Sequence, residues 1–198
     1  SSDVCSSDLA EPSRSIAVWD PAVRLFHWTL AGAFLVAYLT EDDWELLHVN
    51  AGYLIGILIA LRLLWGFVGT PHARFADFVH SPRVVMTYVS DAVRFRAPRH
   101  IGHNPAGGAM VVALLISLAV TVATGIALYG TTDFAGPLAG VWRGELAADV
   151  LEEIHEVGAN LTLLLVVLHL GGVLFSSIEH GENLIKSMIT GRKKEVQA

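Results

Sequence analysis

Four of the nine histidines in this 198-residue chain lie inside apolar blocks, where an ionisable side chain is costly and marks a functional site by default. They are His27, His48, His155 and His169. The other five lie in loops or at helix ends and need no special explanation: His72, His80, His100, His103 and His180. An imidazole can ligate a metal, relay a proton or bond two helices together, so the spacing has to decide between these roles.

His155 and His169 are fourteen residues apart in one apolar block. In an α-helix, fourteen residues at about 100° each come within about 40° of whole turns and rise roughly 21 Å. The two imidazoles therefore share one face of a helix, but they are too far apart to share a metal ion. Each can instead serve its own centre, one near each surface of a membrane.

The composition places such a helix in a lipid bilayer. Hydrophobic residues make up 53% of the chain and charged residues 16%, and the mean hydropathy is +0.53, outside the range of ordinary soluble domains. Four apolar blocks have about the length that spans a hydrocarbon core, namely residues 22–39, 46–68, 106–129 and 150–176. We therefore expect an all-α, integral membrane four-helix bundle.

Three parts of the chain differ in composition. Residues 1–15 are polar with a repeated Ser-Ser-Asp, and we expect them to be disordered. Residues 16–190 contain the transmembrane domain, and residues 191–198 form a basic tail. A longer link between the second and third helices, residues 69–105, includes an amphipathic piece, residues 81–95, that is suited to the headgroup plane.

The distribution of lysine and arginine predicts the orientation, because cation-rich short loops stay in the cytoplasm. Twelve of the 13 cations lie in the N-terminal piece, in the long link with the end of the second helix, or in the tail. The exception is Arg143, between the third and fourth helices. We therefore expect both termini of this multi-pass protein to face the cytoplasm.

This topology pairs the four histidines by depth. His27 begins the first helix near the cytoplasm, whereas His48 begins the second helix near the outer face. The fourth helix also begins outside, so His155 lies at the depth of His48, and His169, roughly four turns further on, lies at the depth of His27. Two cross-helix pairs result, His27 with His169 and His48 with His155.

Two opposed imidazoles with no carboxylate or thiolate beside them match bis-His ligation of a haem iron better than a zinc or di-iron site. Cys5 is the single cysteine and no CxxCH motif occurs, so any haem is held noncovalently. Small residues near the histidines would leave hollows for a flat macrocycle: Gly32, Gly52, Gly56, Gly158 and Gly172. Ordinary helix packing explains any single glycine equally well, and interhelical hydrogen bonding is the alternative for any single histidine.

Four motifs accompany these histidines: VWDPAVRLFHW around His27, RLLWGFVGTPHARF at the end of the second helix, GHNPAGG opening the third, and H-x13-H in the fourth. Together, over about residues 16–190, they resemble the bacterial cytochrome b561 family and the related b-type cytochrome subunits of nickel-iron hydrogenases. The resemblance implies two b haems in a bundle in the bacterial cytoplasmic membrane, ligated by the same four histidines. It also implies a quinone site beside the cytoplasmic haem.

Other polar residues lie near the expected cytoplasmic centre. Arg24 and Arg62 are at the cytoplasmic ends of the first and second helices, where a guanidinium can pair with a haem propionate. His103 and Asn104 can do the same or line a quinone pocket. Headgroup anchoring explains the arginines equally well.

Two redox centres stacked across a bilayer predict a transmembrane electron carrier between quinone or quinol and an external partner, such as a soluble cytochrome c or a hydrogenase-like complex. One alternative is the membrane anchor of a multisubunit dehydrogenase or hydrogenase, and another is a cofactor-free transporter with proton-relay histidines. Quinol–quinone oxidoreductase activity and a homodimer stay open. The four apolar blocks make membrane lipid an expected partner. No hydrolytic triad, phosphate-binding glycine loop or nucleic-acid motif occurs in the sequence, so we expect no nucleic-acid partner.

Overall fold

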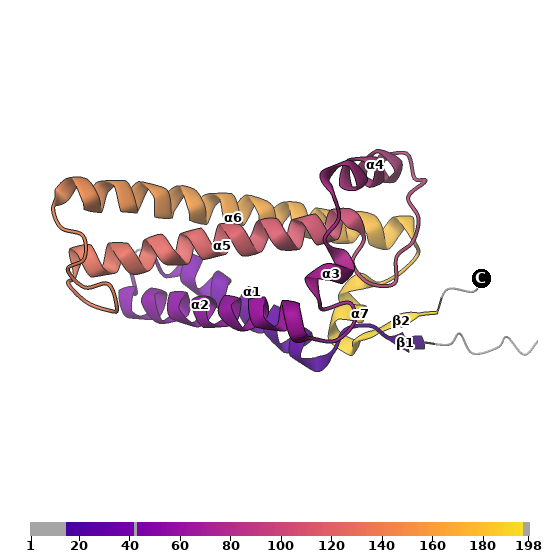
Figure 1. The fold of residues 1–198 in the computed structure, drawn as a ribbon, viewed down its shortest axis with the longest axis horizontal. Helices are drawn as coiled ribbons and strands as arrows, with labels where there is room; N and C mark the ends of the chain where they lie inside the picture. Colours follow the sequence, from indigo (N-terminus) through magenta and orange to yellow (C-terminus); the bar gives the residue numbers. More distant parts are fainter. Residues whose placement is uncertain (1–14, 42, 196–198) are drawn as a thin grey trace, which may run out of the picture.

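A computed structural model describes residues 15–41 and 43–195, and its main feature is an antiparallel bundle of four long helices (Figure 1). They are α1 (Pro21–Leu39), α2 (Glu45–Val68), α5 (Pro105–Thr132) and α6 (Glu145–Glu179). Each is long and apolar enough to cross a membrane, which confirms the four predicted spans. Cys5 and nearly all of the expected disordered segment lie outside the described residues.

The short elements gather at one end of the bundle, beside both ends of the described chain (Figure 1). They are β1 (Ser15–Ala17), α3 (Phe75–Phe78), α4 (Pro82–Val93), α7 (Leu184–Thr190) and β2 (Arg192–Lys194). We call this end the tail end, and we call the opposite end, with the α1–α2 and α5–α6 connections, the far end. Helix α4 falls within the amphipathic piece of the long link.

Side-chain caps fix where two of the spanning helices begin at the tail end. Asp20 accepts a hydrogen bond from the backbone N–H of Val23 at 2.8 Å, and Asn104 accepts one from Gly107 at 2.7 Å. A proline follows each cap at the first helical position, where its fixed φ and missing N–H cost nothing. The Asp20 cap therefore sets the depth of His27, which lies within the first two turns of α1.

A short ribbon ties the two ends of the described chain together. Strands β1 and β2 pair antiparallel, with Ile16 opposite Lys193. The backbone N–H groups of Val18 and Trp19 then donate to the carbonyl of Gly191, at 2.8 and 3.1 Å. The entry to α1 is thus bound to the segment that follows α6 and α7.

Helices α5 and α6 approach closely through small and hydroxyl-bearing residues. A Cβ added to Gly158 would lie 2.6 Å from Oγ1 of Thr121, so only glycine allows this approach. One turn further on, the Ser117 and Thr162 hydroxyls are 2.7 Å apart, and Thr162 is fully buried. Many large apolar side chains elsewhere on the bundle face outward, as expected of helices surrounded by lipid.

Candidate functional site

The structure brings the four histidines of the apolar blocks together as two pairs, the pairs that the spacing predicts. The ring centroids of His27 and His169 are 6.3 Å apart, with the ring planes at 53°. Those of His48 and His155 are 5.9 Å apart, with the planes at 75°. Helix α6 supplies one member of each pair, and we call them the tail pair (His27–His169) and the far pair (His48–His155).

The spacing within each pair fits two axial ligands on one iron. With about 2 Å for each metal–nitrogen bond and about 1 Å from each nitrogen to its ring centre, two such imidazoles have centres about 6 Å apart. In the part of the chain that the structure describes, no group of three or more His, Cys, Asp or Glu residues could hold a metal ion. Each pair therefore offers two protein ligands, and a metal here needs its remaining ligands from another source, such as a macrocycle.

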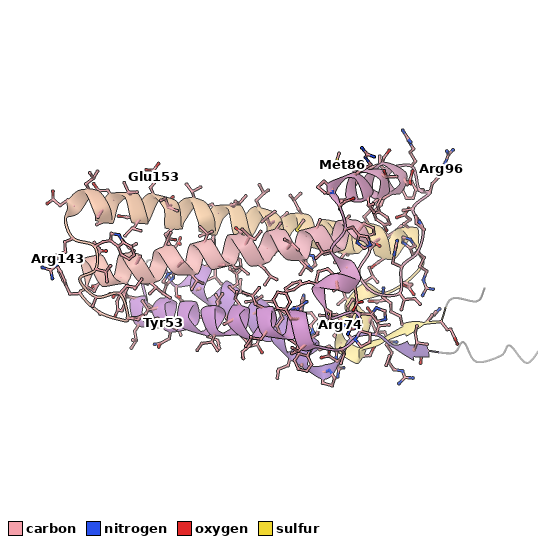
Figure 2. The ribbon with its side chains drawn as sticks, viewed as in Figure 1. Tyr53, Arg74, Met86, Arg96, Arg143 and Glu153 are labelled. Carbon is pink, nitrogen blue, oxygen red and sulfur yellow. The ribbon has the colours of Figure 1, made fainter. Side chains whose placement is uncertain are left out.

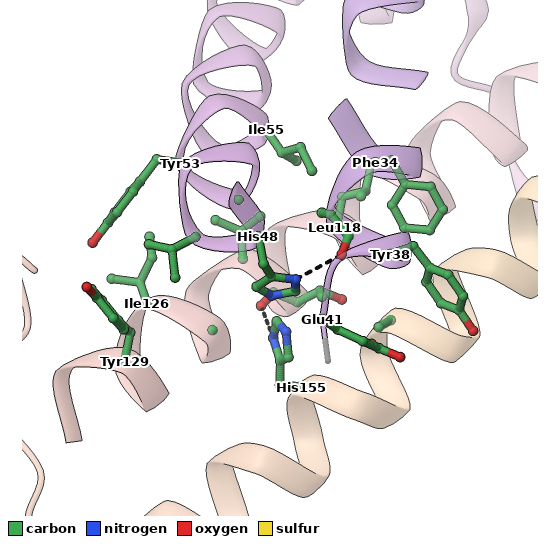
Figure 3. Close-up of a pocket in the computed structure, with 17 residues that line it drawn as sticks. Phe34, Tyr38, Glu41, His48, Tyr53, Ile55, Leu118, Ile126, Tyr129 and His155 are labelled. Carbon is green, nitrogen blue, oxygen red and sulfur yellow. Dashed lines mark hydrogen bonds between the residues drawn. The ribbon is translucent and has the colours of Figure 1, made fainter. Parts of the chain in front are cut away.

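Backbone carbonyls orient both rings of the far pair. Nδ1 of His48 donates to the carbonyl of Ala37, and Nδ1 of His155 donates to the carbonyl of Thr121, each at 2.8 Å (Figure 3). Because Nδ1 carries the proton in this arrangement, Nε2 of each ring keeps its lone pair for a metal. Such hydrogen bonds fix the tautomer and the ring orientation of metal-ligating histidines.

A cavity surrounds the far pair, bounded by residues of all four spanning helices (Figure 3). Its lining is mostly apolar and aromatic, including Phe34, Tyr38 and Tyr129, with the carboxylate-bearing Glu41 at one side. Gly52 also lines it, and a Cβ added there would meet nothing within 4 Å. The cavity is therefore built from apolar walls with unfilled space next to the imidazoles, as a bound macrocycle requires.

The glycines that the spacing suggested as hollows divide into two kinds. Gly32, Gly52 and Gly172 have open space where a Cβ would lie. Gly56 and Gly158 serve helix packing instead, because a Cβ would lie 3.1 Å from Val122 or 2.6 Å from Thr121. A further glycine, Gly125 of α5, leaves room for the His155 ring: its Cβ would lie 2.7 Å from Cε1 of that ring.

Buried donors without partners are concentrated around the tail pair. Four side-chain nitrogens there are buried and have no hydrogen-bond partner among the described residues: Arg24 Nε, His27 Nδ1, Arg62 Nη1 and His103 Nδ1. An unpaired buried polar group is costly, so such a concentration calls for acceptors that a ligand supplies. Haem propionates are acceptors of this kind for Arg24, Arg62 and His103, and the residues present therefore fit the group.

Two guanidinium groups border this region. Arg62 of α2 is only 5% exposed; its Nη2 donates to the carbonyl of Ala73 at 3.0 Å and its guanidinium stacks over Phe75 at 5.2 Å. Arg24 of α1 donates through Nη1 to the carbonyl of Ile189 at 2.7 Å. Each arginine thus keeps part of its donor set for another acceptor.

His103 precedes α5 and is enclosed by aromatic rings. The ring centroids of Trp19 and Phe78 are 4.6 and 4.8 Å from its own. Burial, helped by the positive charge of Arg62, lowers the pKa of His103 to about 3, so this imidazole is neutral near pH 7. Its neighbour Asn104 uses its side-chain oxygen to cap α5, which gives that oxygen a structural role.

Comparison with known proteins agrees with this arrangement. Residues 18–191 match the family model described as "Prokaryotic cytochrome b561". The chain is 26% identical to a probable Ni/Fe-hydrogenase B-type cytochrome subunit of Rhizobium leguminosarum bv. viciae, over 91% of this chain and 89% of the relative. It is 25% identical to the protein of the same name from Bradyrhizobium diazoefficiens (96% and 90% covered) and 27% identical to that of Azotobacter vinelandii (89% and 88%).

No solved structure gives a significant match. The family match extends from the entry of α1 to the end of α7 and includes both histidine pairs. The chain belongs to the prokaryotic cytochrome b561 family, and it is a membrane-embedded b-type cytochrome that carries haem b and works in electron transfer.

Proposed function

We propose that this chain holds two b haems, one at each histidine pair, and carries electrons across a bacterial cytoplasmic membrane between the quinone pool and an external redox partner. The observation that carries the proposal is the pairing itself: two sets of opposed imidazoles, 6.3 and 5.9 Å between ring centroids, joined by the single helix α6. When bound, haem supplies a one-electron centre at each level.

The far pair acts through preorganised rings. The carbonyls of Ala37 and Thr121 hold the Nδ1 atoms of the His48 and His155 rings, which would leave both Nε2 atoms free to hold a haem iron. Apolar walls around the rings exclude water and lower the local dielectric, and this environment tunes the potential of a centre bound there.

The tail pair acts together with the unpaired donors around it. His27 and His169 would hold the haem iron, while Arg24 and Arg62 would donate their free N–H groups to its propionates. His103, neutral and within electrostatic reach of His169, belongs to the same region and borders the quinone site. Quinone oxidation or reduction thus takes place beside the tail pair, with Asn104 at the neighbouring helix start.

The orientation follows from the cations. The short elements and the described ends of the chain at the tail end carry most of the lysines and arginines, whereas Arg143 lies in the α5–α6 connection at the far end (Figure 2). The tail end therefore faces the cytoplasm, and the far pair is the one near the external surface.

The external partner is a hydrogenase. The relatives named above are called B-type cytochrome subunits of Ni/Fe-hydrogenases, and the chain covers almost their whole length, which supports the same place for this chain in a membrane complex. A soluble cytochrome c is the alternative partner. Co-purification from mildly solubilised membranes distinguishes them, because a hydrogenase anchor brings down a nickel-containing subunit in fixed ratio.

The test of the two-haem proposal is a count. The purified chain should contain two haem b per polypeptide by the pyridine haemochrome assay, with the bis-imidazole, low-spin spectrum of six-coordinate iron. His155→Leu and His169→Leu should each lose one haem, and His80→Gln, a change outside both pairs, should lose neither. One haem per wild-type chain, or the loss of both haems in either single variant that still folds, would refute the proposal.

A further inference from the structure

The fourteen-residue spacing seen in α6 recurs in the two other ligand-bearing helices, with charged residues in place of one histidine. Glu41 stands fourteen residues after His27, just past the end of α1, and Arg62 stands fourteen residues after His48 in α2. The same rise of roughly 21 Å places Arg62 at the level of the tail pair and Glu41 at the level of the far pair. The two levels therefore receive charges of opposite sign.

The charge of Arg62 is buried and incompletely compensated. Its side chain is 5% exposed, it bonds to a carbonyl rather than to a carboxylate, and its Nη1 has no partner among the described residues. Asp20 is the carboxylate within electrostatic reach, but its oxygens accept from Thr70, Trp65 and the N–H of Val23. Arg62 is thus a fixed positive charge in an apolar setting, where charges act strongly.

Other charged groups at the tail end do not reverse this sign. Lys193 is buried, with Nζ 3.3 Å from the carbonyl of His100 and 3.9 Å from the carboxylate of Glu182. Glu182 is in turn paired with Arg99. Glu179 is a further buried carboxylate at this end, and it accepts from the backbone N–H of Ala97 at 3.3 Å. Arg24, Arg62, Arg99 and Lys193 therefore face Asp20, Glu179 and Glu182, which leaves one positive charge in excess among these groups.

The far pair has the opposite environment. Glu41 is an exposed residue at the edge of the cavity that holds His48 and His155, and it lies beside the His155 ring in Figure 3. The lining residues of that cavity include no lysine or arginine. The nearest connection that carries a cation is α5–α6, where Arg143 is exposed and bonds to the carbonyl of Gly140.

Charge near an iron changes its reduction potential, because oxidation adds one positive charge to the centre. A neighbouring cation favours the ferrous form and raises the potential, whereas a neighbouring carboxylate favours the ferric form and lowers it. We propose that Arg62 and Glu41 set the order of the two haem potentials, so that the centre at the tail pair is the more easily reduced. This inference rests on the proposed function, because it requires one haem at each pair.

The step that follows is a single-electron transfer. With haem at both pairs, His48 and His155 would hold the one-electron donor and His27 and His169 the one-electron acceptor, so the transfer would need no bond or proton change in the protein. The hydrogenase partner supplies the electron and quinone accepts it at the tail end. Propionates offset part of the Arg62 charge, but haems at both levels carry propionates, so the difference between the levels persists.

The experiment is a spectroelectrochemical titration of single-haem proteins. The His169→Leu background keeps the far centre and the His155→Leu background keeps the tail centre. Glu41→Gln in the first background should raise the ferrous-to-ferric ratio at a fixed electrode potential about threefold, or about 30 mV for one electron. Glu153→Gln is the matched control: it removes the same charge from α6, but its side chain points away from the bundle (Figure 2), and it should change the ratio much less.

Arg62 is tested in the second background. Arg62→Gln should lower the ferrous-to-ferric ratio of the tail centre by at least about threefold, whereas Arg62→Lys, which keeps the charge, should stay closer to the parent. Arg96→Gln removes an exposed cation from the α4 region and is the control (Figure 2). If Arg62→Gln fails to hold haem, the order of the two potentials and the Glu41 series decide.

The outcomes separate this inference from the function beneath it. A chain that binds no haem, or one haem, refutes the proposed function. Two haems with the far centre at the higher potential would overturn the inference alone. So would a Glu41→Gln shift no larger than that of Glu153→Gln, because the carboxylate in the cavity would then have no special effect.

Discussion

Replacing Gly125 with alanine should displace the His155 ring and weaken haem binding at the far pair. The new methyl group would lie 2.7 Å from Cε1 and 3.0 Å from Nδ1 of that imidazole, closer than non-bonded atoms approach. The ring has little freedom to move away, because its Nδ1 is bonded to the carbonyl of Thr121 at 2.8 Å. Relief of the clash therefore breaks this hydrogen bond or shifts α5 relative to α6.

The magnitude follows from those two costs. Overpacking by one methyl group costs about 1–3 kcal/mol, and a lost hydrogen bond costs about 1 kcal/mol. The low end of the overpacking cost and the cost of the lost hydrogen bond together give about 2 kcal/mol. Because about 1.4 kcal/mol corresponds to a factor of ten in affinity, haem affinity at the far pair should fall about thirtyfold. Affinity at the tail pair should be unchanged, because Gly125 contacts neither of its rings.

The assay is a titration of the apoprotein in detergent with haem, followed by the Soret absorbance. Gly171→Ala is the matched control, since a Cβ there meets nothing within 4 Å. Two residues after His169, it is also turned about 200° around α6, away from the ligand face. If Gly125→Ala binds two haems with the affinity of the parent, the observed position of the His155 ring is not the one that binds haem, and the reasoning is refuted.

Three further predictions concern the cavity, the tail end and pH. Gly52→Leu should fill the open space of the far cavity and leave one haem per chain in a haemochrome count, without loss of helix content by circular dichroism. Arg99→Ala, which removes an ion pair with Glu182, should lower the free energy of unfolding by about 1–2 kcal/mol in a thermal melt, and an unchanged midpoint would contradict this. Burial and the charge of Arg62 lower the pKa of His103 from 6.5 to about 3. Between these two pH values the imidazole is protonated in the unfolded chain and neutral in the folded chain. Stability should therefore fall between pH 7 and pH 5 by about 2 kcal/mol more in the parent than in His103→Asn, and equal losses in both would contradict the assignment.

The spans and the histidine pairing follow from the sequence because both depend on helix periodicity and hydropathy. All four predicted blocks lie inside the observed spanning helices, and their ends differ by a few residues. The largest differences are in α6, which begins at Glu145 rather than near residue 150. Its first turns contain acidic residues, so a search for apolar blocks stops short of them although the helix continues.

Other parts of the site leave no trace in side-chain types. The carbonyls of Ala37 and Thr121 orient the far pair, but a backbone acceptor is present at every position and cannot be singled out by residue type. Gly125 matters through a contact between α5 and α6, and the sequence does not encode which faces of those helices meet. The β1–β2 ribbon joins segments at opposite ends of the chain, and three-residue strands carry too little pattern to predict.

Helix α6 carries one imidazole of each pair and is the last of the four described spanning helices to be synthesised. A nascent chain that has inserted α1, α2 and α5 presents His27 and His48 without their opposing ligands. Both centres can be completed only after the ribosome has made α6, and the ribbon between β1 and β2 then closes behind it. On the proposed function, cofactor loading therefore has to wait for α6, and a product truncated before α6 should leave the membrane colourless.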